Sequence, residues 1–351
     1  MVVSLERATE ILSQILEKAG LSRTRAGQLA DLFVTTEAKG VWSHGIGLTA
    51  KYTEQFLKGT INTEPNITVV RQYPSSMVLD GDRGLGVTVM EHAVDKAMSM
   101  ARQNGIGCVT VTNLQHYAAG LYYAQRPADE GMIMLMVANA PKSMAPYGGS
   151  VKYYGTNPLT FAAPMGNMPT YCLDMATTVC AGNKLEHAAN FGQQVAEGLG
   201  LDRYGNPSKD PLEILKYGSL LPFGGAKGSG IAGMVNIMAG ILSGAAYRDD
   251  VISLCRDKAK PSNYGSCLIM LDISKFMDYQ EYSERAQIWA NDILNNPPAK
   301  GFDKVIYPGY AEGMRWIKAK ESGLELSEIG LKSLKTAGSM VGLDMEKLLP
   351  A

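Results

Sequence analysis

The chain has 351 residues, 46% of them hydrophobic and 19% charged, and a formal net charge of −1. This near-neutral balance gives no electrostatic reason to expect a nucleic acid or an anionic membrane as a partner. No apolar run reaches the roughly 18 residues of a transmembrane helix. The first 20 residues carry acidic side chains at helical spacing, unlike a signal peptide. The length exceeds what one hydrophobic core usually serves, so we expect two domains.

The cysteines point to a reducing compartment and away from a metal site. They form no CxxC pair and their number is odd, which predicts reduced thiols in a cytoplasmic protein. No group of cysteines and histidines has the spacing of zinc ligands, so no metal is expected. The five are Cys108, Cys172, Cys180, Cys255 and Cys267.

The chain opens with helical periodicity. One apolar face runs from Leu5 to Leu16 and stops at Gly20. Ser22 precedes a second apolar face that ends near Gly40. Residues 52–57 suggest a third helix, so the opening is expected to be a helical unit.

Strand and helix patterns alternate from residue 76 onward, which predicts an α/β domain. Helical spacing resumes from about residue 275 to the end, and a helix bracketed by glycines is expected over 231–243. The Gly- and Pro-rich stretch 198–230 is expected to be a long ordered loop or lid. The remaining predictions are strands at 76–80, 106–112, 132–139, 159–164, 170–176 and 265–273, and helices at 87–104 and about 118–130.

Two glycine-rich stretches invite nucleotide-binding interpretations. GDRGLG (81–86) lies between a strand and a helix, but its order is GxxGxG instead of GxGxxG, and no acidic residue follows at the usual distance. A glycine turn entering a helix is favoured over a Rossmann phosphate loop. GGAKGSG (224–230) has its lysine before the glycine, unlike a Walker loop. It is either a flexible loop or a backbone that approaches an anion, with Lys227 as point charge.

Two of the four histidines lie beside glycines at the ends of predicted elements: His44 in WSHG and His116 in NLQHYAAG. Histidine suits proton transfer because its unperturbed pKa is about 6.5. Ser43 is placed to orient the His44 ring. A lone histidine is more often structural, and His92 and His187 are interpreted so. A Ser-His-Asp hydrolase is a third possibility, but no GxSxG motif is present.

Taken in order, the motifs resemble the malate/L-lactate dehydrogenase family, which is distinct from the Rossmann-fold dehydrogenases. The resemblance covers about residues 5–330, and the stretch 192–229 is most similar to the Δ1-piperideine-2-carboxylate reductase branch. The residues that carry it are WSHGIGLTAKY (42–52), LDGDRGLG (79–86), NLQHYAAG (113–120), APYGG (145–149), YGTNPLTFAAP (154–164), LDMATT (173–178), LPFGGAKG (221–228) and AGILSGA (239–245).

The resemblance implies a fold, a cofactor and a reaction. The fold is a non-Rossmann NAD(P)-binding α/β domain with a large mixed sheet, over 76–304. A helical domain over 1–75 is joined by 305–351, and the protein is a homodimer. The cofactor is NADH or NADPH, with the choice unresolved. The reaction is hydride transfer to a C=O or C=N group beside a carboxylate, as in a 2-oxo acid or a cyclic imino acid.

The resemblance also assigns site residues. His44 matches the acid/base histidine with Ser43 in its relay, and His116 matches a second histidine used in catalysis or nicotinamide contact. Lys142 falls where ureidoglycolate dehydrogenase-like sequences place a functional lysine. Thr156 and Asn157 match a substrate-proximal segment. The expected cofactor contacts are His116, Tyr117, Ala118, Asp174, Met175, Ala176, Gly225, Ala226, Lys227, Pro308 and Gly309.

Two departures from the family pattern concern the substrate. The usual Asp before Ser-His-Gly is Trp42, and the Arg that clamps a carboxylate is Leu48. Leucine cannot replace a bidentate guanidinium contact, which contributes about 1.5–3 kcal/mol. We therefore expect a substrate that is more apolar or differently anchored near Leu48, such as a cyclic imine. Two alternatives stay open: a catalytically retired paralogue that only binds cofactor or ligand, and a ureidoglycolate or hydroxycarboxylate dehydrogenase-like activity.

Overall fold

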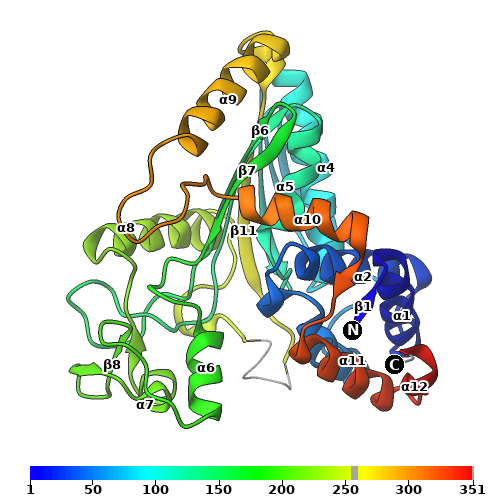
Figure 1. Ribbon diagram of the computed structural model, residues 1–351, viewed down its shortest axis with the longest axis vertical. Coiled ribbons are helices and arrows are strands. Elements are labelled where there is room, and N and C mark those ends of the chain that lie inside the picture. The colour runs from blue at the N-terminus through cyan, green and yellow to red at the C-terminus, as the bar shows by residue number, and fades with distance from the viewer. Residues whose placement is uncertain (254–259, 350–351) are drawn as a thin grey trace.

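A seven-stranded mixed sheet forms the centre of the computed structural model, which describes residues 1–253 and 260–349 (Figure 1). Only β3 and β4 pair in parallel; the other neighbours are antiparallel. A Rossmann sheet is mostly parallel, so the non-Rossmann expectation is confirmed. In spatial order the strands are β2 (Thr68–Tyr73), β3 (Ser76–Asp80), β4 (Ile106–Leu114), β11 (Tyr264–Asp272), β5 (Met132–Ala138), β6 (Leu159–Met165) and β7 (Met168–Met175).

Helices cover both faces of this sheet. On one face α4 (Gly86–Asn104) and α5 (Gly120–Asp129) pack on alternate strand residues such as Val109 and Met134. On the other face α8 (Ala226–Val235) packs through Val235 against Cys267. Helix α9 (Tyr279–Leu294) covers β6 near one end of the sheet (Figure 1). This burial on both faces explains the continuous apolar runs in the strand sequences.

The two ends of the chain meet beside the sheet. Strand β1 (Val2–Val3) pairs with β12 (Leu324–Glu325), and the termini lie close together in Figure 1. The largest hydrophobic cluster runs without a break from these helices into β4 and β11. The expected mixed sheet with helices from both chain ends is therefore confirmed. The helices involved are α1 (Leu5–Lys18), α2 (Arg23–Ala38), α3 (Thr49–Leu57), α10 (Tyr310–Ser322), α11 (Glu328–Met340) and α12 (Met345–Leu348).

Strand β2 lies within the segment that was expected to be helical. All six of its residues are exposed, including Val69, Val70 and Tyr73, so its sequence lacks the apolar alternation that marks a half-buried strand. It is an edge strand held only by β3. The division of the chain at residues 75 and 76 stays a prediction.

The expectation of a long loop over 198–230 was wrong. This stretch holds a small sheet and a helix that bury a core of their own around Ile214 and Leu220. Strands of two residues are too short to show a period, which is why the sequence concealed them. The elements are β8 (Gly200–Leu201), β9 (Pro207–Ser208), β10 (Ser219–Leu220) and α7 (Pro211–Lys216), next to α6 (Gly182–Asn190).

Helix α8 begins earlier than expected, at Ala226 instead of residue 231. Gly228 and Gly230 lie inside it; a side chain at Gly228 would meet the Phe223 backbone, so close packing requires glycine there. The flexible-loop interpretation of Lys227 is therefore wrong, because Lys227 lies in the first turn of this helix. The helix continues as a π-helical turn, Asn236–Ile241.

One edge of the sheet collects the segments with candidate site residues. The register pairs Leu114 with Tyr264, Val137 with Leu159, and Leu159 with Met175. The loops after β4, β5 and β7 therefore leave the sheet on the same side, facing the turn that carries His44. No described helix is long and apolar enough to cross a membrane.

Candidate active site

The two glycine-flanked histidines lie against each other. The rings of His44 and His116 are stacked, with centroids 5.9 Å apart and planes 20° apart. His44 comes from the short helix Trp42–His44 after α2, and His116 from the loop after β4. Ser43 Oγ is 2.9 Å from His44 Nδ1, which leaves Nε2 of His44 for other partners. The structure thus joins these three predicted residues in one site.

Tyr52 of α3 fixes the His116 ring. Its hydroxyl lies 2.7 Å from the His116 carbonyl oxygen and 2.8 Å from Nδ1. The carbonyl can only accept, so the hydroxyl donates to it, and Nδ1 is the N–H that donates to the hydroxyl. The competing Ala118 N–H is 3.4 Å from Nδ1 and weak. His116 is therefore the Nδ1–H tautomer, with Nε2 as an acceptor that bonds to none of the residues the structure describes.

The two imidazoles differ in protonation. Burial, together with the nearby charges of His44 and Lys51, lowers the pKa of His116 to about 3. Burial also lowers the pKa of His44, although Asp174 opposes this shift. His116 is consequently neutral at physiological pH, and the carboxylate of Asp174 favours the protonated form of His44.

We expect His116 to make the fold acid-sensitive. In the unfolded chain its pKa is about 6.5, so between pH 6.5 and about 3 the unfolded state binds more protons than the folded state. Stability is complete above pH 6.5 and falls as the pH drops. From pH 7 to pH 5, the wild type should lose about 2 kcal/mol more unfolding free energy than His116→Gln in urea titrations. Equal losses in both proteins would show that His116 is not the group responsible.

Buried Glu37 of α2 holds the turn that carries His44. Its carboxylate accepts hydrogen bonds from Ile46 N at 3.0 Å and from Ser327 Oγ at 2.6 Å. A side chain at Gly45 would approach Glu37 Oε2 to 2.5 Å, so the turn requires glycine there. Burial raises the pKa of Glu37. Glu37 thus connects α2, the His44 turn and the N-terminus of α11.

The His116 loop is held in a restricted backbone conformation. Asn113 and Ala118, on either side of His116, both have left-handed φ angles of 51° and 64°, which cost energy in residues with a side chain. The GDRGLG turn supports this loop: Arg83 N bonds to Asn113 O at 2.8 Å. A side chain at Gly86 would meet His116 O. The turn is therefore a glycine turn entering α4, as the sequence favoured.

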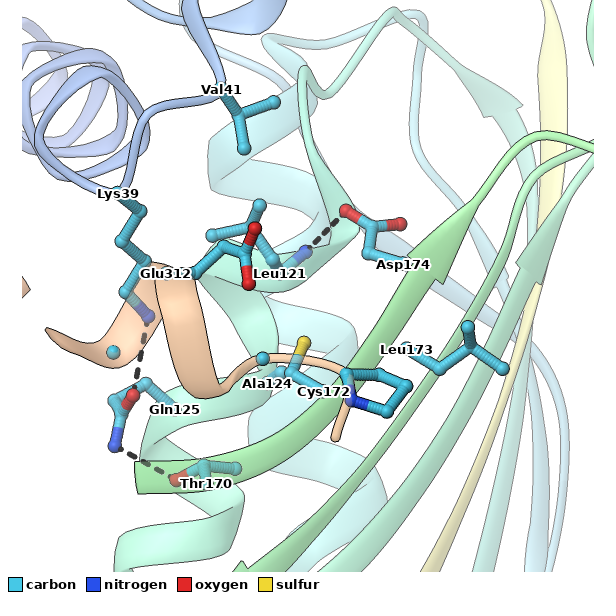
Figure 2. Close-up of a pocket in the computed structure, with 13 residues that line it drawn as sticks. Lys39, Val41, Leu121, Ala124, Gln125, Thr170, Cys172, Leu173, Asp174 and Glu312 are labelled. Carbon is cyan, nitrogen blue, oxygen red and sulfur yellow. Dashed lines mark hydrogen bonds between the residues drawn. The ribbon is translucent and has the colours of Figure 1, made fainter. Parts of the chain in front are cut away.

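Asp174, an expected cofactor residue, accepts hydrogen bonds at the start of α5. Leu121 N donates to Oδ2 at 2.9 Å (Figure 2). Thr160 Oγ1 donates to Oδ1 at 2.8 Å. A carboxylate at a helix N-terminus is favoured by the helix dipole. Burial raises the pKa of Asp174, and these hydrogen bonds oppose the shift. Its charge also acts on His44, so Asp174 links the histidine pair to the neighbouring pocket.

That pocket has a volume of about 210 Å³ and lies between α2, α5, β7 and the start of α10 (Figure 2). Three expected cofactor residues, Asp174, Pro308 and Gly309, line it together with Val41 near the His44 turn. Lys39, which the sequence did not single out, also lines it and is 6% exposed.

The second group of expected cofactor residues continues from β7. After Met175 and Ala176, Thr177 O accepts from Phe223 N at 3.1 Å, and Val179 N donates to Leu221 O at 2.8 Å. This pairing leads to Gly225, which has a φ of 62° and precedes α8 without a side-chain cap. Ala226 and Lys227 form the first turn. The free N–H groups there suit an anion.

Other predicted residues have structural partners. Tyr117 O accepts from Tyr123 OH at 2.8 Å, and Thr156 O accepts from Thr177 N at 2.8 Å. Asn157 is fully buried, and its amide bonds to Ala140 N and Ala232 O. Their predicted contacts with substrate or cofactor stay predictions.

Two more expected site residues lie in contrasting places. Lys142 is exposed and forms an ion pair with Asp249, and no hydrogen bond or ring contact found among the described residues joins it to His44 or His116. Leu48 is 9% exposed and belongs to the main hydrophobic cluster. Both roles stay predictions.

Within 1–253 and 260–349 no group of residues is arranged to hold a metal ion, and four cysteines are free; Cys255 lies outside the described residues.

The residues present fit a nicotinamide dinucleotide. Two helices, α8 and α10, begin at glycines that make no side-chain cap. The turn before α8 pairs with Thr177 and the turn before α10 with Cys172, so the two helix starts flank the segment around Asp174. Uncapped helix N-termini bind phosphate well. The histidine pair lies next to the same segment, so a cofactor held there reaches an ionisable ring.

The chain is similar over almost its whole length to known proteins of one family. A family model described as malate/L-lactate dehydrogenase matches residues 3–335. L-sulfolactate dehydrogenase of Methanocaldococcus jannaschii is 32% identical over 99% of both chains, and its solved structure has a TM-score of 0.89 with the same coverage. Ureidoglycolate dehydrogenase (NAD(+)) of Escherichia coli is 30% identical over 93% of both chains. A Delta(1)-pyrroline-2-carboxylate/Delta(1)-piperideine-2-carboxylate reductase of Pseudomonas putida is 29% identical over 93% of both.

The chain therefore belongs to the malate/L-lactate dehydrogenase family. It is an NAD(P)-dependent oxidoreductase, and the resemblance found in the sequence is confirmed.

Proposed function

We propose that the chain reduces a C=O or C=N bond next to a carboxylate, reversibly, with His44 as proton donor and acceptor. The observation that carries this proposal is the stacked His44–His116 pair beside the pocket lined by Asp174, Pro308 and Gly309. The bound cofactor, NADH or NADPH, would supply the hydride. Asp174, Met175, Ala176, Gly225, Ala226, Lys227, Pro308 and Gly309 would hold it.

His44 would donate its proton to the oxygen or nitrogen of the bond being reduced, and recover it in oxidation. Ser43 Oγ, bonded to Nδ1, keeps the ring oriented with Nε2 outward. Neutral His116 adds no competing proton; its free Nε2 accepts a hydrogen bond from substrate or from the nicotinamide amide. This division of roles follows from the pKa of His116, lowered to about 3, and from Asp174, which opposes the lowering of the pKa of His44.

The substrate is proposed to be a 2-oxo acid or a cyclic imino acid. The names of the relatives include dehydrogenases of malate, sulfolactate and ureidoglycolate and a reductase of cyclic imino acids. Leu48 offers no charge to a carboxylate and is packed in the core. An apolar ring of the substrate fits beside Leu48 better than a second carboxylate of the substrate does, which favours the cyclic imine.

A panel of oxidisable and reducible substrates tests this function. With NADH or NADPH, we expect Δ1-piperideine-2-carboxylate or phenylpyruvate to be reduced with a higher kcat/KM than oxaloacetate, followed as loss of reduced-cofactor absorbance. The physical reason is that a dicarboxylate has no guanidinium to pair with at position 48. Binding of cofactor without turnover on any member of the panel would instead indicate a retired, ligand-binding paralogue.

We also propose a homodimer. In support, Ile237, Ile241 and Leu242, on and just after the π-helical turn that follows α8, are each more than half exposed and form an apolar surface.

A further inference from the structure

Lys39 is a buried amine at the end of α2. It is 6% exposed, and Nζ donates a hydrogen bond to Gln125 Oε1 at 3.2 Å. Gln125 is itself fixed, because its Nε2 donates to Thr170 Oγ1 at 3.3 Å (Figure 2) and to Asp129 Oδ1 at 2.9 Å. The carboxamide oxygen is therefore the atom that faces the lysine.

This amine has unused donors. An ammonium carries three N–H groups, and among the described residues no carboxylate lies within 4 Å of Lys39 Nζ. Burial lowers the pKa of Lys39, and the charges of Cys172, Asp129 and Glu312 oppose this shift without a hydrogen bond to the amine. A buried charge is normally paired, so two N–H groups at a cavity wall indicate a missing anionic partner.

The N-terminus of α10 opens into the same pocket. Pro308, Gly309, Glu312 and Gly313 line it, and the helix is 13 residues long. Gly309 has a φ of 89° and gives no side-chain cap. Cys172 N donates to Pro308 O at 2.9 Å, which holds this turn against β7. The positive end of the helix dipole therefore faces the pocket opposite Lys39.

We propose that Lys39 and the first turn of α10 together bind a phosphate group of the nicotinamide cofactor. This assignment rests on the proposed function and adds a residue to it. The pocket, about 210 Å³, is smaller than the roughly 300–1,000 Å³ of ordinary ligand sites, so it accepts part of a dinucleotide and not the whole. A phosphodiester has two unshared oxygens, one for the ammonium and one for the amides of α10.

The place of the pocket favours a phosphate of the cofactor over the carboxylate of the substrate. Asp174 and Glu312 also line the pocket and repel either anion alike, so charge does not separate the two. His44 does not line it, so the reacting end of the substrate, with its carboxylate, lies outside it. The position beside Asp174, Pro308 and Gly309 is also where the cofactor is proposed to lie.

The test is equilibrium binding, read from the fluorescence of reduced cofactor. Lys39→Met keeps the length and suits the burial, so it should remain folded, as circular dichroism checks. It should raise the dissociation constants of NADH and NADPH by about 10- to 100-fold. Lys39→Arg, which keeps the charge, should lose less. Lys18→Met, at the exposed end of α1, is the matched control and should bind as the wild type does.

Smaller probes separate a phosphate contact from a structural effect. Reduced nicotinamide mononucleotide carries one phosphate and the reduced riboside none. A loss of dinucleotide affinity in Lys39→Met together with unchanged riboside affinity supports the assignment. An equal loss for the riboside, or unchanged cofactor binding with a raised KM for the oxo or imino acid, overturns it. If the wild type binds neither NADH nor NADPH, the proposed function fails and this inference fails with it. If the wild type binds the cofactor and Lys39→Met binds it equally well, the proposed function stands and only the role of the lysine is wrongly assigned.

Discussion

Replacing His44 with alanine should lower the turnover number at least about a hundredfold in both directions of the reaction. The imidazole is the titratable ring of the stacked pair, and Ser43 holds it with Nε2 available. Without it, the developing alkoxide or amine must take its proton from water. The dissociation constant of the reduced cofactor, measured by fluorescence, should stay unchanged, because His44 does not line the pocket with Lys39 and Gly309.

The pH profile identifies His44 as the proton carrier. Burial places its pKa below 6.5, with Asp174 opposing the shift. Reduction needs the protonated ring, so its kcat/KM should fall as the pH rises through and above that pKa. Oxidation needs the neutral ring, so its kcat/KM should be constant above pH 6.5 and fall in acid. Both slopes should disappear in His44→Ala and persist in the control His92→Ala on α4. Wild-type turnover in His44→Ala would refute the role.

Much of the fold could be predicted from the sequence because burial on both faces of the sheet leaves continuous apolar runs. The strands from β3 to β7 and β11 were found within a few residues for this reason. Strand β2 was missed because an exposed edge strand needs no apolar residues. The segment 198–230 was missed because its order comes from two-residue strands and a small separate core around Ile214.

The site was only partly visible in the sequence. His44 and His116 could be singled out because glycines beside them are local signals of a tight backbone. The partners that define their chemistry are distant in sequence: Tyr52 reaches His116 across 64 residues, and Glu37 reaches Ser327 across 290. Lys39 has an ordinary sequence context, and only its burial among α2, α5 and α10 marks it. Tyr52 alone had a signal, since it ends the matched motif WSHGIGLTAKY.

Tyr52→Phe should lower kcat roughly 10- to 100-fold, because the His116 ring is no longer held in its orientation. This loss corresponds to an activation free energy raised by about 1.5–3 kcal/mol. The ring of Tyr52 is 1% exposed and packs edge-on against Phe33 at 5.3 Å, so phenylalanine keeps the packing. What is removed is the hydroxyl, which accepts from His116 Nδ1 and donates to the His116 carbonyl. The unfolding free energy should fall by about 1–3 kcal/mol because both His116 groups lose a buried partner.

The tautomer of His116 separates hydrogen bonding from packing, because a purely structural role of Tyr52 would leave the tautomer unchanged. Imidazole nitrogen NMR of the wild type should show His116 protonated on Nδ1, because the Tyr52 hydroxyl is committed to the carbonyl oxygen. In Tyr52→Phe the Nε2–H form should appear, removing the acceptor that is proposed to bind the substrate or the nicotinamide amide. Tyr204→Phe, at an 81% exposed position, should change neither the spectrum nor kcat. If His116 keeps its Nδ1 proton in Tyr52→Phe while kcat falls, Tyr52 acts through packing and the hydrogen-bond argument is wrong.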